Sequence, residues 1–296
     1  MTADTRTVAR RATAVGGIAV LLWATLALFT TLTGAIPPFQ LVAMTFGIAF
    51  VVGTIGSLVR GRGLLNHLRQ PPAVWLLGVT GLFGYHFLYF MALKAAPPVE
   101  ASLIAYLWPL LIVLFSALLP GEHLRWWHAM GALAGLSGTV LLVTGGEGLT
   151  IKAEYLPGYL LALACAVTWS GYSVLSRRFG DVPTDAVGGF CLATAVLAGL
   201  CHLGFETTVT PEGPQWLAVL LLGLGPVGAA FFVWDYGVKY GDIRALGALS
   251  YATPLLSTLL LILTGRAEGR WTIWAACALI VGGAVLASQD LLRRRG

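Results

Sequence analysis

Long apolar segments recur along this sequence, and each is long enough to cross a lipid bilayer. A helix needs about 20 residues to span roughly 30 Å of hydrocarbon. Ten segments of the 296-residue chain meet this requirement: 13–33, 39–59, 73–93, 98–119, 126–145, 156–177, 185–205, 214–238, 243–264 and 271–291. The gaps between them are short and rich in proline, glycine and charge, so no soluble domain fits anywhere. Because the segments are twice as long as barrel strands and do not alternate in polarity, a β-barrel is excluded.

The composition leads to the same class. The chain is 57% hydrophobic and 10% charged, whereas about 25% of the residues of a soluble domain are charged. Too little polar surface exists to cover a water-soluble globule of this size. We therefore expect an all-α integral membrane protein of ten transmembrane helices, in contact with the lipid bilayer.

Lysine and arginine are distributed unevenly between the two sides of the predicted helices. With a cytoplasmic N-terminus, fourteen of the 18 Lys and Arg residues fall on the cytoplasmic side. This bias predicts that both termini are cytoplasmic, which requires an even number of spans. The net charge of +5 does not indicate a nucleic-acid partner, because the positive charges lie in short gaps between apolar segments.

The two halves of the chain are similar in sequence. The residue pairs that coincide at an offset of 145 or 146 are Trp23 and Trp169, Lys94 and Lys239, Tyr106 and Tyr251, and Pro109 and Pro254. Each half holds five spans, and because five is odd the second half must cross the membrane upside down. We therefore expect two five-helix repeats of inverted topology, at 1–148 and 149–296, around a central cavity.

Polar and aromatic side chains gather near the middle of several spans. In "GYHFLYF", Tyr85, His86 and Tyr89 share one helical face, because they are spaced by three or four residues. A lipid-facing imidazole or phenol would lack hydrogen-bond partners, so this face is expected to point inward. Two interpretations stay open: these residues line a substrate pocket, or they hydrogen-bond neighbouring helices together.

Tryptophans at mid-membrane depth extend this aromatic set. Trp23 and Trp169 lie too deep for the interfacial belt, and aromatic walls suit a flat solute that carries an ammonium group. An aromatic amino acid fits this description, and so do many amphipathic drugs. The candidate substrate-binding residues are Trp23, Tyr85, His86, Tyr89, Tyr106, Trp108, Trp169, Tyr172, Ser250 and Ser257.

Two prolines occupy matching positions in the two halves. Pro109 and Pro254 each lie inside a span, where proline frees a backbone carbonyl and bends the helix. We expect them to act as hinges around the central cavity. A packing bend without a ligand is the alternative.

Charged side chains are scarce inside the spans. Asp235 is the one carboxylate clearly within a predicted span, and it is expected to pair with Lys239 one turn away. Lys94 and Lys239 end their spans, so we expect both to extend to the membrane interface. Since ion-coupled carriers usually have buried carboxylates, we expect facilitated transport, with His86 as the main candidate for any proton coupling. No cysteine, histidine or aspartate pattern indicates a metal, a cofactor or an enzyme.

The length, the ten spans, the two five-span halves and the paired "AYLWP" and "SYATP" segments together resemble the drug/metabolite transporter superfamily, and within it the EamA-type family. The aromatic set resembles that of the aromatic amino acid exporters in this family. The resemblance implies a monomeric secondary transporter that exports aromatic and other neutral amino acids across the bacterial inner membrane by alternating access. The alternative is a proton-coupled exporter of drugs or other metabolites from the same superfamily.

Overall fold

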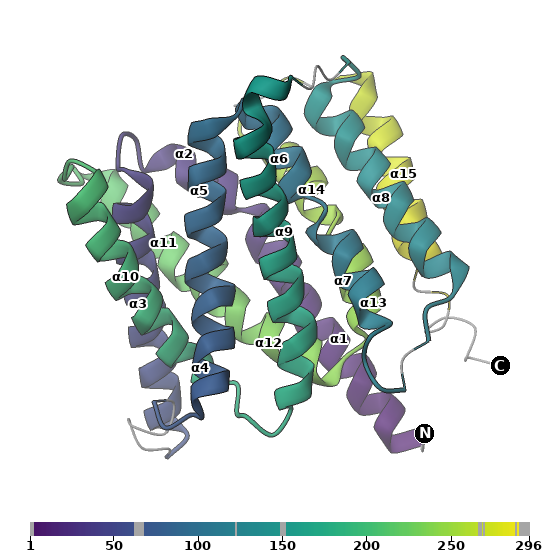
Figure 1. Ribbon diagram of the computed structural model, residues 1–296, viewed down its shortest axis with the longest axis horizontal. Coiled ribbons are helices and arrows are strands. Elements are labelled where there is room, and N and C mark those ends of the chain that lie inside the picture. The colour runs from purple at the N-terminus through teal and green to yellow at the C-terminus, as the bar shows by residue number, and fades with distance from the viewer. Residues whose placement is uncertain are drawn as a thin grey trace.

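The computed structural model of the chain is a bundle of membrane-spanning helices (Figure 1). It describes residues 3–61, 68–121, 123–148, 152–265, 268, 270–287 and 289. In the first half, span 1 is α1 (Ala3–Ala24) with α2 (Leu26–Leu32), span 2 is α3 (Pro38–Val59), span 3 is α4 (Pro72–Val79), the π-helix η1 (Thr80–Gly84) and α5 (Tyr85–Ala95), span 4 is α6 (Pro98–Ala105) with α7 (Trp108–Ser116), and span 5 is α8 (Trp126–Thr144).

The second half repeats this order. Span 6 is η2 (Ala153–Tyr155), α9 (Leu156–Ser176) and η3 (Arg177–Phe179), span 7 is α10 (Ala186–Phe205), span 8 is α11 (Pro214–Leu224), the π-helix η4 (Gly225–Ala229) and α12 (Ala230–Tyr240), span 9 is α13 (Ile243–Leu249) with α14 (Ala252–Leu263), and span 10 is α15 (Trp271–Ala287). Nine of these described spans are long and apolar enough to cross a membrane, and α15 is a shorter apolar helix. The prediction of ten helical spans is confirmed.

Some sequence-based expectations fall outside the described residues. They are the end of the last span at 291, the repeat boundary at 149, and the basic residues Arg62, Arg266 and Arg293–Arg295.

The first helix, α1, begins on the side of the bundle where the last helix, α15, ends. In Figure 1, α1 starts at the lower edge and α15 runs from the upper edge back toward it. We call this edge the terminal side and the opposite edge the far side. Spans 2, 4, 6, 8 and 10 therefore end on the terminal side, and spans 3 and 8 run in opposite directions, as the inverted repeat requires.

Proline begins many of the helices. Pro38, Pro72, Pro98 and Pro214 each occupy the first turn of a helix, where the missing N–H would have no intrahelical partner. The fixed φ of proline also suits a helical start after a short extended loop. Proline, which is frequent in the gaps of the sequence, thus sets where spans 2, 3, 4 and 8 begin.

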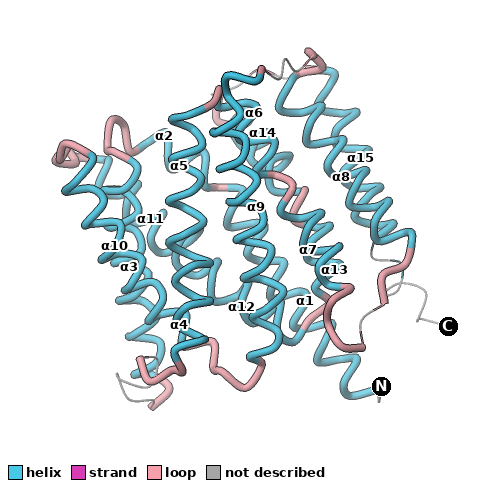
Figure 2. The backbone as a smooth tube through the Cα atoms, viewed as in Figure 1, coloured by secondary structure: helices cyan, strands magenta, loops and turns pink. Residues whose placement is uncertain are grey.

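Most interruptions of the helices occur at equivalent places in the two halves, although the break at Thr25 between α1 and α2 has no counterpart in the continuous α9. The π-helices η1 and η4 start and end 145 residues apart, at Thr80 and Gly225 and at Gly84 and Ala229. Span 4 is interrupted between α6 and α7, and span 9 between α13 and α14, again at matching positions (Figure 2). Such irregular backbone is stable at membrane depth only where protein or a polar cavity surrounds it. The interruptions therefore mark the interior of the bundle.

Local chemistry explains each π-helix. In η4, Pro226 has no N–H and its ring would meet the carbonyl of Leu222, so the regular α-helical pattern cannot continue. In η1, Gly81 faces the ring of Tyr172 so closely that any side chain would overlap it. A wider turn at this glycine lets span 3 approach span 6 closely.

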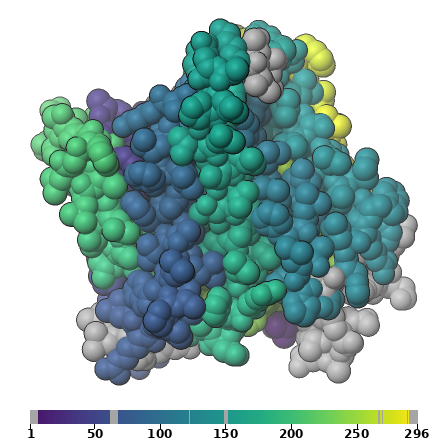
Figure 3. All heavy atoms as spheres, in the orientation of Figure 1, coloured from purple at the N-terminus to yellow at the C-terminus, as the bar shows by residue number. Residues whose placement is uncertain are grey.

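Packing divides the bundle into a centre and a flank. α1 packs along α12, α5 along α9, and α3 along α10, while α8 and α15 pack mainly on each other. Figure 3 shows α10, the α4–α5 helix and α9 side by side on one face, with the first-half helices α6 to α8 next to them. Spans 5 and 10 thus support the side of the molecule rather than its centre.

The α8–α15 interface depends on small residues. A Cβ atom at Gly131 would lie 2.5 Å from the carbonyl oxygen of Gly283 and 2.7 Å from the amide nitrogen of Ala287. Gly282 directly precedes Gly283 on α15, and a Cβ atom there would have open space around it. Close backbone approach through glycine is a common way to associate membrane helices, because dispersion contacts increase as the helices near each other.

We predict that the same substitution has opposite effects at these two positions. Gly131→Ala pushes α8 away from α15 and lowers the free energy of unfolding by about 1–3 kcal/mol. Gly282→Ala leaves it unchanged or raises it by up to about 1 kcal/mol, because alanine favours helix more than glycine does. Thermal unfolding of the purified variants in detergent measures both. Equal stability of the two variants would contradict the described interface.

Candidate functional site

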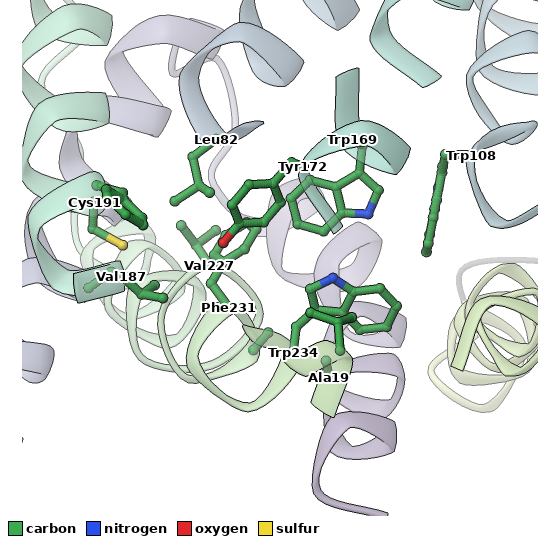
Figure 4. Close-up of a cluster of buried hydrophobic side chains, with 14 of the residues drawn as sticks. Ala19, Leu82, Trp108, Trp169, Tyr172, Val187, Cys191, Val227, Phe231 and Trp234 are labelled. Atoms are coloured by element: carbon green, nitrogen blue, oxygen red, sulfur yellow. The ribbon is translucent and has the colours of Figure 1, made fainter. Parts of the chain in front are cut away.

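Four tryptophans meet at the centre of the bundle. Trp23, Trp108, Trp169 and Trp234 come from spans 1, 4, 6 and 8, and we call them the tryptophan cluster. The ring centroids of Trp23 lie 6.1, 5.8 and 5.1 Å from those of Trp108, Trp169 and Trp234. Figure 4 shows the rings of Trp169 and Trp234 facing one another, with Trp108 to one side and edge-on. These edge-to-face and stacked geometries are the favourable ones for aromatic pairs.

The inverted repeat explains how the cluster forms. Trp23 and Trp169 are equivalent in the two halves and touch each other. Phe231 is likewise equivalent to His86 at an offset of 145, and their ring centroids are 6.4 Å apart. Residues that the symmetry makes equivalent thus meet where the two halves face each other.

The repeat also contained a signal that the sequence analysis missed. Trp234 and Phe231 stand 145 residues after Tyr89 and His86, so shifting the aromatic set by the repeat offset identifies both. Phe46 of α3 belongs to the same cluster through its stacking on Phe231, with centroids 5.4 Å apart. Phe46 has no such sequence signal, because only tertiary packing brings span 2 to this point.

Buried serines hold the cluster in place. The indole N–H of Trp234 donates to the hydroxyl of Ser173 at 3.1 Å. The hydroxyl of Ser170 lies 2.9 Å from the carbonyl oxygen of Trp108 and 2.6 Å from that of Ala166 on its own helix. These hydrogen bonds fix the indole of Trp234 and join α9 to the backbone of α7 at Trp108.

The residues of "GYHFLYF" lie on the far side of the tryptophan cluster. The ring of Tyr85 tilts against Trp169, with centroids 5.5 Å apart, and is nearly parallel to that of Tyr89. Their expected inward orientation is therefore observed. Tyr89 also forms a hydrogen bond of 3.1 Å with Ser102 of α6, so this tyrosine links spans 3 and 4.

His86 has one occupied and one available ring nitrogen. Its Nδ1 lies 2.7 Å from the carbonyl oxygen of Leu82, and its ring packs edge-on against Phe46. Since a carbonyl oxygen only accepts, we assign Nδ1 as the donor of a neutral imidazole. Nε2 is then a hydrogen-bond acceptor beside the aromatic cluster.

Three of the candidate residues are not in contact with this network. Ser250 is buried, and its hydroxyl donates to the carbonyl oxygen of Leu246 in its own helix at 2.8 Å. Ser257 is half-buried on α14, and Tyr106 is half-buried at the interruption of span 4. Pro109 and Pro254 directly follow the interruptions of spans 4 and 9 and are both buried. The proposed roles of these five residues, like the substrate contacts of the other candidates, stay predictions.

The two sides of the bundle are packed very differently. α5 and α12 are equivalent in the repeat, yet α5 buries only Ala92, whereas α12 buries seven residues, including Trp234 and Asp235. The two helices occupy equivalent positions at opposite ends of the bundle: α5 extends to the far side and α12 to the terminal side. α12 is therefore more fully enclosed by protein near the terminal side than α5 is near the far side.

Polar contacts add to the closure of the terminal side. They join the connection between spans 6 and 7 to the end of span 8: Thr184 donates to Asp235 at 2.7 Å, Lys239 to the carbonyl oxygen of Val182 at 3.0 Å, Tyr240 to that of Gly180 at 2.7 Å, and Arg177 to that of Gly241 at 2.8 Å. In addition, Arg60 at the end of span 2 pairs with Asp185. On the far side, the repeat equivalent of Asp235 is Phe90, which makes an aromatic contact instead: its ring packs edge-on against that of Phe39.

The ion pair that the sequence predicted is present. Lys239 Nζ lies 2.9 Å from Asp235 Oδ2, and their side chains are only 4% and 2% exposed. The expectation that Lys239 extends to the membrane interface is therefore wrong. Its partners Asp235 and Val182 hold the ammonium group inside the protein, whereas its repeat equivalent Lys94 is exposed.

No set of metal ligands occurs in the described part of the chain. Among those residues, no group of three or more histidine, cysteine, aspartate or glutamate side chains is arranged to hold a metal ion. The free cysteines Cys165 and Cys191 are buried. What the site offers chemically is therefore aromatic surface, a few hydrogen-bonding groups and one adjacent ion pair.

Comparisons with known proteins agree with this architecture. The sequence model of the EamA-like transporter family matches residues 12–144 and 156–289. The aromatic amino acid exporter YddG of Ancylobacter novellus is 61% identical over 287 residues, which cover 96% of this chain and 98% of that protein. The aromatic amino acid exporter YddG of Salmonella typhimurium is 25% identical, over 96% of this chain and 99% of that protein. A solved crystal structure superimposes with a TM-score of 0.91 at 60% identity, covering 96% of this chain and 99% of that one.

We predict that Ser173 and Trp234 stabilise the protein as a pair. Ser173→Ala leaves the buried indole N–H without an acceptor and lowers the free energy of unfolding by about 1–3 kcal/mol. In a Trp234→Phe background the same change costs less, since no donor remains. Thermal unfolding of the wild type, the two single variants and the double variant gives the coupling free energy between Ser173 and Trp234. The exposed Ser137→Ala is the control and is expected to change stability by less than about 0.5 kcal/mol. Additive effects would show that the hydrogen bond does not stabilise the cluster.

Proposed function

Because this chain belongs to the EamA-like transporter family, we propose that it exports aromatic and other neutral amino acids across the bacterial inner membrane by alternating access. The observation that carries the proposal is the 61% identity, over nearly the full length of both proteins, to a protein named as an aromatic amino acid exporter. Identity of this extent preserves the interior of a bundle as well as its outline. We further propose that the protein acts as a monomer.

The chemistry of the centre supports this substrate class. The tryptophan cluster, with Tyr85 and Phe231, offers flat apolar surfaces against which an aromatic side chain packs. The acceptor Nε2 of His86 and the faces of the aromatic rings suit an ammonium group. We assign substrate contact to this set, with the halves 1–148 and 149–296 rocking about the breaks that precede Pro109 and Pro254.

The distribution of charge supports an orientation. The sequence assigns fourteen of the 18 Lys and Arg residues to the side on which span 1 begins, which makes that side the cytoplasmic one under the positive-inside rule. The tightly packed ends of spans 6, 7 and 8 then close the cytoplasmic side, and α5 borders the periplasmic opening. In this orientation the described conformation is outward-open.

The scarcity of free intramembrane charge supports transport without ion coupling. Asp235 already accepts from both Lys239 and Thr184, so it is not a free carboxylate ready to take up a proton. A gradient of the exported amino acid is sufficient to drive net efflux. We therefore assign the protein as a facilitator.

The proposal is tested by transport into proteoliposomes. We predict saturable counterflow of labelled phenylalanine that a pH gradient does not accelerate. Trp169→Ala and His86→Ala each reduce its rate by roughly tenfold or more, since each removes a central substrate contact. Trp274→Ala, which removes a tryptophan that is 75% exposed, and His123→Ala, which removes an exposed histidine, are the matched controls and keep the wild-type rate.

The substrate panel separates this function from its alternative. Competition by tyrosine and tryptophan, and not by cationic drugs, supports the amino acid exporter. Competition by cationic drugs together with stimulation by a pH gradient would instead identify a proton-coupled drug exporter. If both central variants transport phenylalanine at the wild-type rate while correctly folded, the assigned site is wrong.

We also predict that chemical labelling distinguishes the two sides. In a variant whose four cysteines are replaced by alanine, Tyr85→Cys reacts with a membrane-impermeant maleimide applied from the periplasmic side. Its repeat equivalent Ala230→Cys does not react from either side, because Ala230 is 0% exposed in the closed half. Faster labelling of Ala230→Cys than of Tyr85→Cys would contradict an outward-open conformation.

A further inference from the structure

An amino acid carries an ammonium and a carboxylate group, yet none of the ten candidate substrate-binding residues carries a permanent charge. We propose that Asp235 and Lys239 form a zwitterion subsite, which receives the ammonium and carboxylate groups of the substrate when the terminal side opens. This inference rests on the proposed function, because it assumes that the substrate is an amino acid. It gives the ion pair a role in choosing the substrate.

The ion pair lies next to the aromatic cluster. Asp235 directly follows Trp234, which stacks on Trp169 with centroids 6.2 Å apart. Tyr172 packs on Trp169 at 5.3 Å and lines a small cavity together with Asp235 and Lys239. A substrate can therefore exchange contacts with the charged pair for contacts with the tryptophans without leaving a continuous surface.

The cavity beside the pair has the chemistry of an amino acid site. Ser176, Asp235 and Lys239 give it polar groups, while Phe179 and Phe190 give it aromatic walls. In the described conformation it is too small for an amino acid, as expected on the side that is closed. It lies between spans 3, 6, 7 and 8, so separation of these helix ends enlarges it.

An unsatisfied hydroxyl points to a missing ligand at this place. Tyr172 is 3% exposed, and its buried hydroxyl lies near Ser176 in the same cavity without forming a hydrogen bond of standard geometry. Figure 4 shows this oxygen directed away from Trp169. A buried hydroxyl that lacks a well-formed hydrogen bond is unfavourable, so its retention in a cavity lined by charged groups favours a ligand that it binds in another conformation.

The fold itself does not require charges at these positions. In the first repeat the equivalents of Asp235 and Lys239 are Phe90, which packs on other aromatic rings, and Lys94, which is exposed. A buried ion pair contributes little net stability compared with apolar residues of similar size. A pair that is present in one half alone, on the side through which an exporter takes up its substrate, is thus better explained by binding than by packing.

Opening of the terminal side removes one partner from each charge, while Asp235 and Lys239 stay paired with each other within α12. As the end of span 8 moves from residues 177–185, Asp235 loses Thr184 and Lys239 loses the carbonyl of Val182. An ammonium group beside Asp235 and a carboxylate beside Lys239 replace the two lost hydrogen bonds and add no net charge. A ligand with only one charge adds an uncompensated charge beside this neutral pair, which is strongly unfavourable.

The experiment compares charge selection in the wild type and in Asp235→Asn/Lys239→Met. Transport of phenylalanine is measured against phenethylamine, which lacks the carboxylate, and 3-phenylpropionate, which lacks the ammonium group. We expect the wild type to prefer phenylalanine over both, and the double variant to lose at least about tenfold of that preference. Removing both charges leaves no unpaired buried ion, so the variant is expected to fold.

Single variants and a matched control refine the result. Lys239→Met shifts the ratio toward phenethylamine, and Asp235→Asn shifts it toward 3-phenylpropionate. Lys94→Met removes the repeat-equivalent lysine on the far side and leaves both ratios unchanged. Should the double variant fail to fold, Tyr172→Phe decides: it removes only the buried hydroxyl, and we expect it to slow phenylalanine transport severalfold without lowering Tm.

The outcomes separate the two hypotheses. If the wild type transports no amino acid, the proposed function fails and the zwitterion subsite falls with it. If the wild type transports phenylalanine and the double variant, or Tyr172→Phe in its place, keeps the wild-type preference and rate, only the subsite is overturned. Altered rates with unchanged ratios in the double and single variants would show that the ion pair merely holds the terminal side closed.

Discussion

Hydrocarbon offers no hydrogen-bond partner to a peptide group, and the arrangement of this bundle follows from that constraint. Each span is helical where it faces lipid, and the irregular turns occur at η1, at η4 and in the middle of spans 4 and 9, where protein surrounds them. These irregular turns are also where the bundle can bend at low cost. The tryptophan cluster lies between them, so the same constraint that confines the breaks to the interior places the aromatic surface beside possible hinges.

The inverted repeat gives the two halves equivalent positions, and the side chains make those positions unequal. Phe90 packs on Phe39 at one end of the bundle, while the equivalent Asp235 is held by Lys239 and Thr184 at the other. Aromatic contact is weakly directional and allows sliding, whereas a buried ion pair with hydrogen bonds requires one arrangement. A symmetric scaffold with unequal contacts at its two ends therefore rests with one end closed, as a carrier with alternating access must.

The division of chemistry between the centre and the terminal side also follows from solvation. Aromatic rings bury apolar area at little polar cost and suit the middle of the membrane, where Trp169 and Phe231 meet. Full charges are expensive there and are tolerated only as partners. The ion pair accordingly lies near one end of span 8, one residue beyond the cluster, where it reaches both the cavity of Tyr172 and the connection between spans 6 and 7.

The sequence by itself determined the ten spans, the inverted repeat and the pairing of Asp235 with Lys239, because hydropathy, repeat offset and helical spacing are local properties of the chain. It also placed Trp23, Tyr85, His86 and Trp169 on the interior, since polar aromatic groups at mid-membrane depth need protein partners. Only the tertiary structure decided that Phe46 completes the cluster, that Ser250 hydrogen-bonds within its own helix, and that Lys239 is buried while Lys94 is exposed. Those facts depend on which helices pack against each other. The free energy of that packing comes from contacts between segments far apart in the chain, so no local pattern in the sequence reveals it.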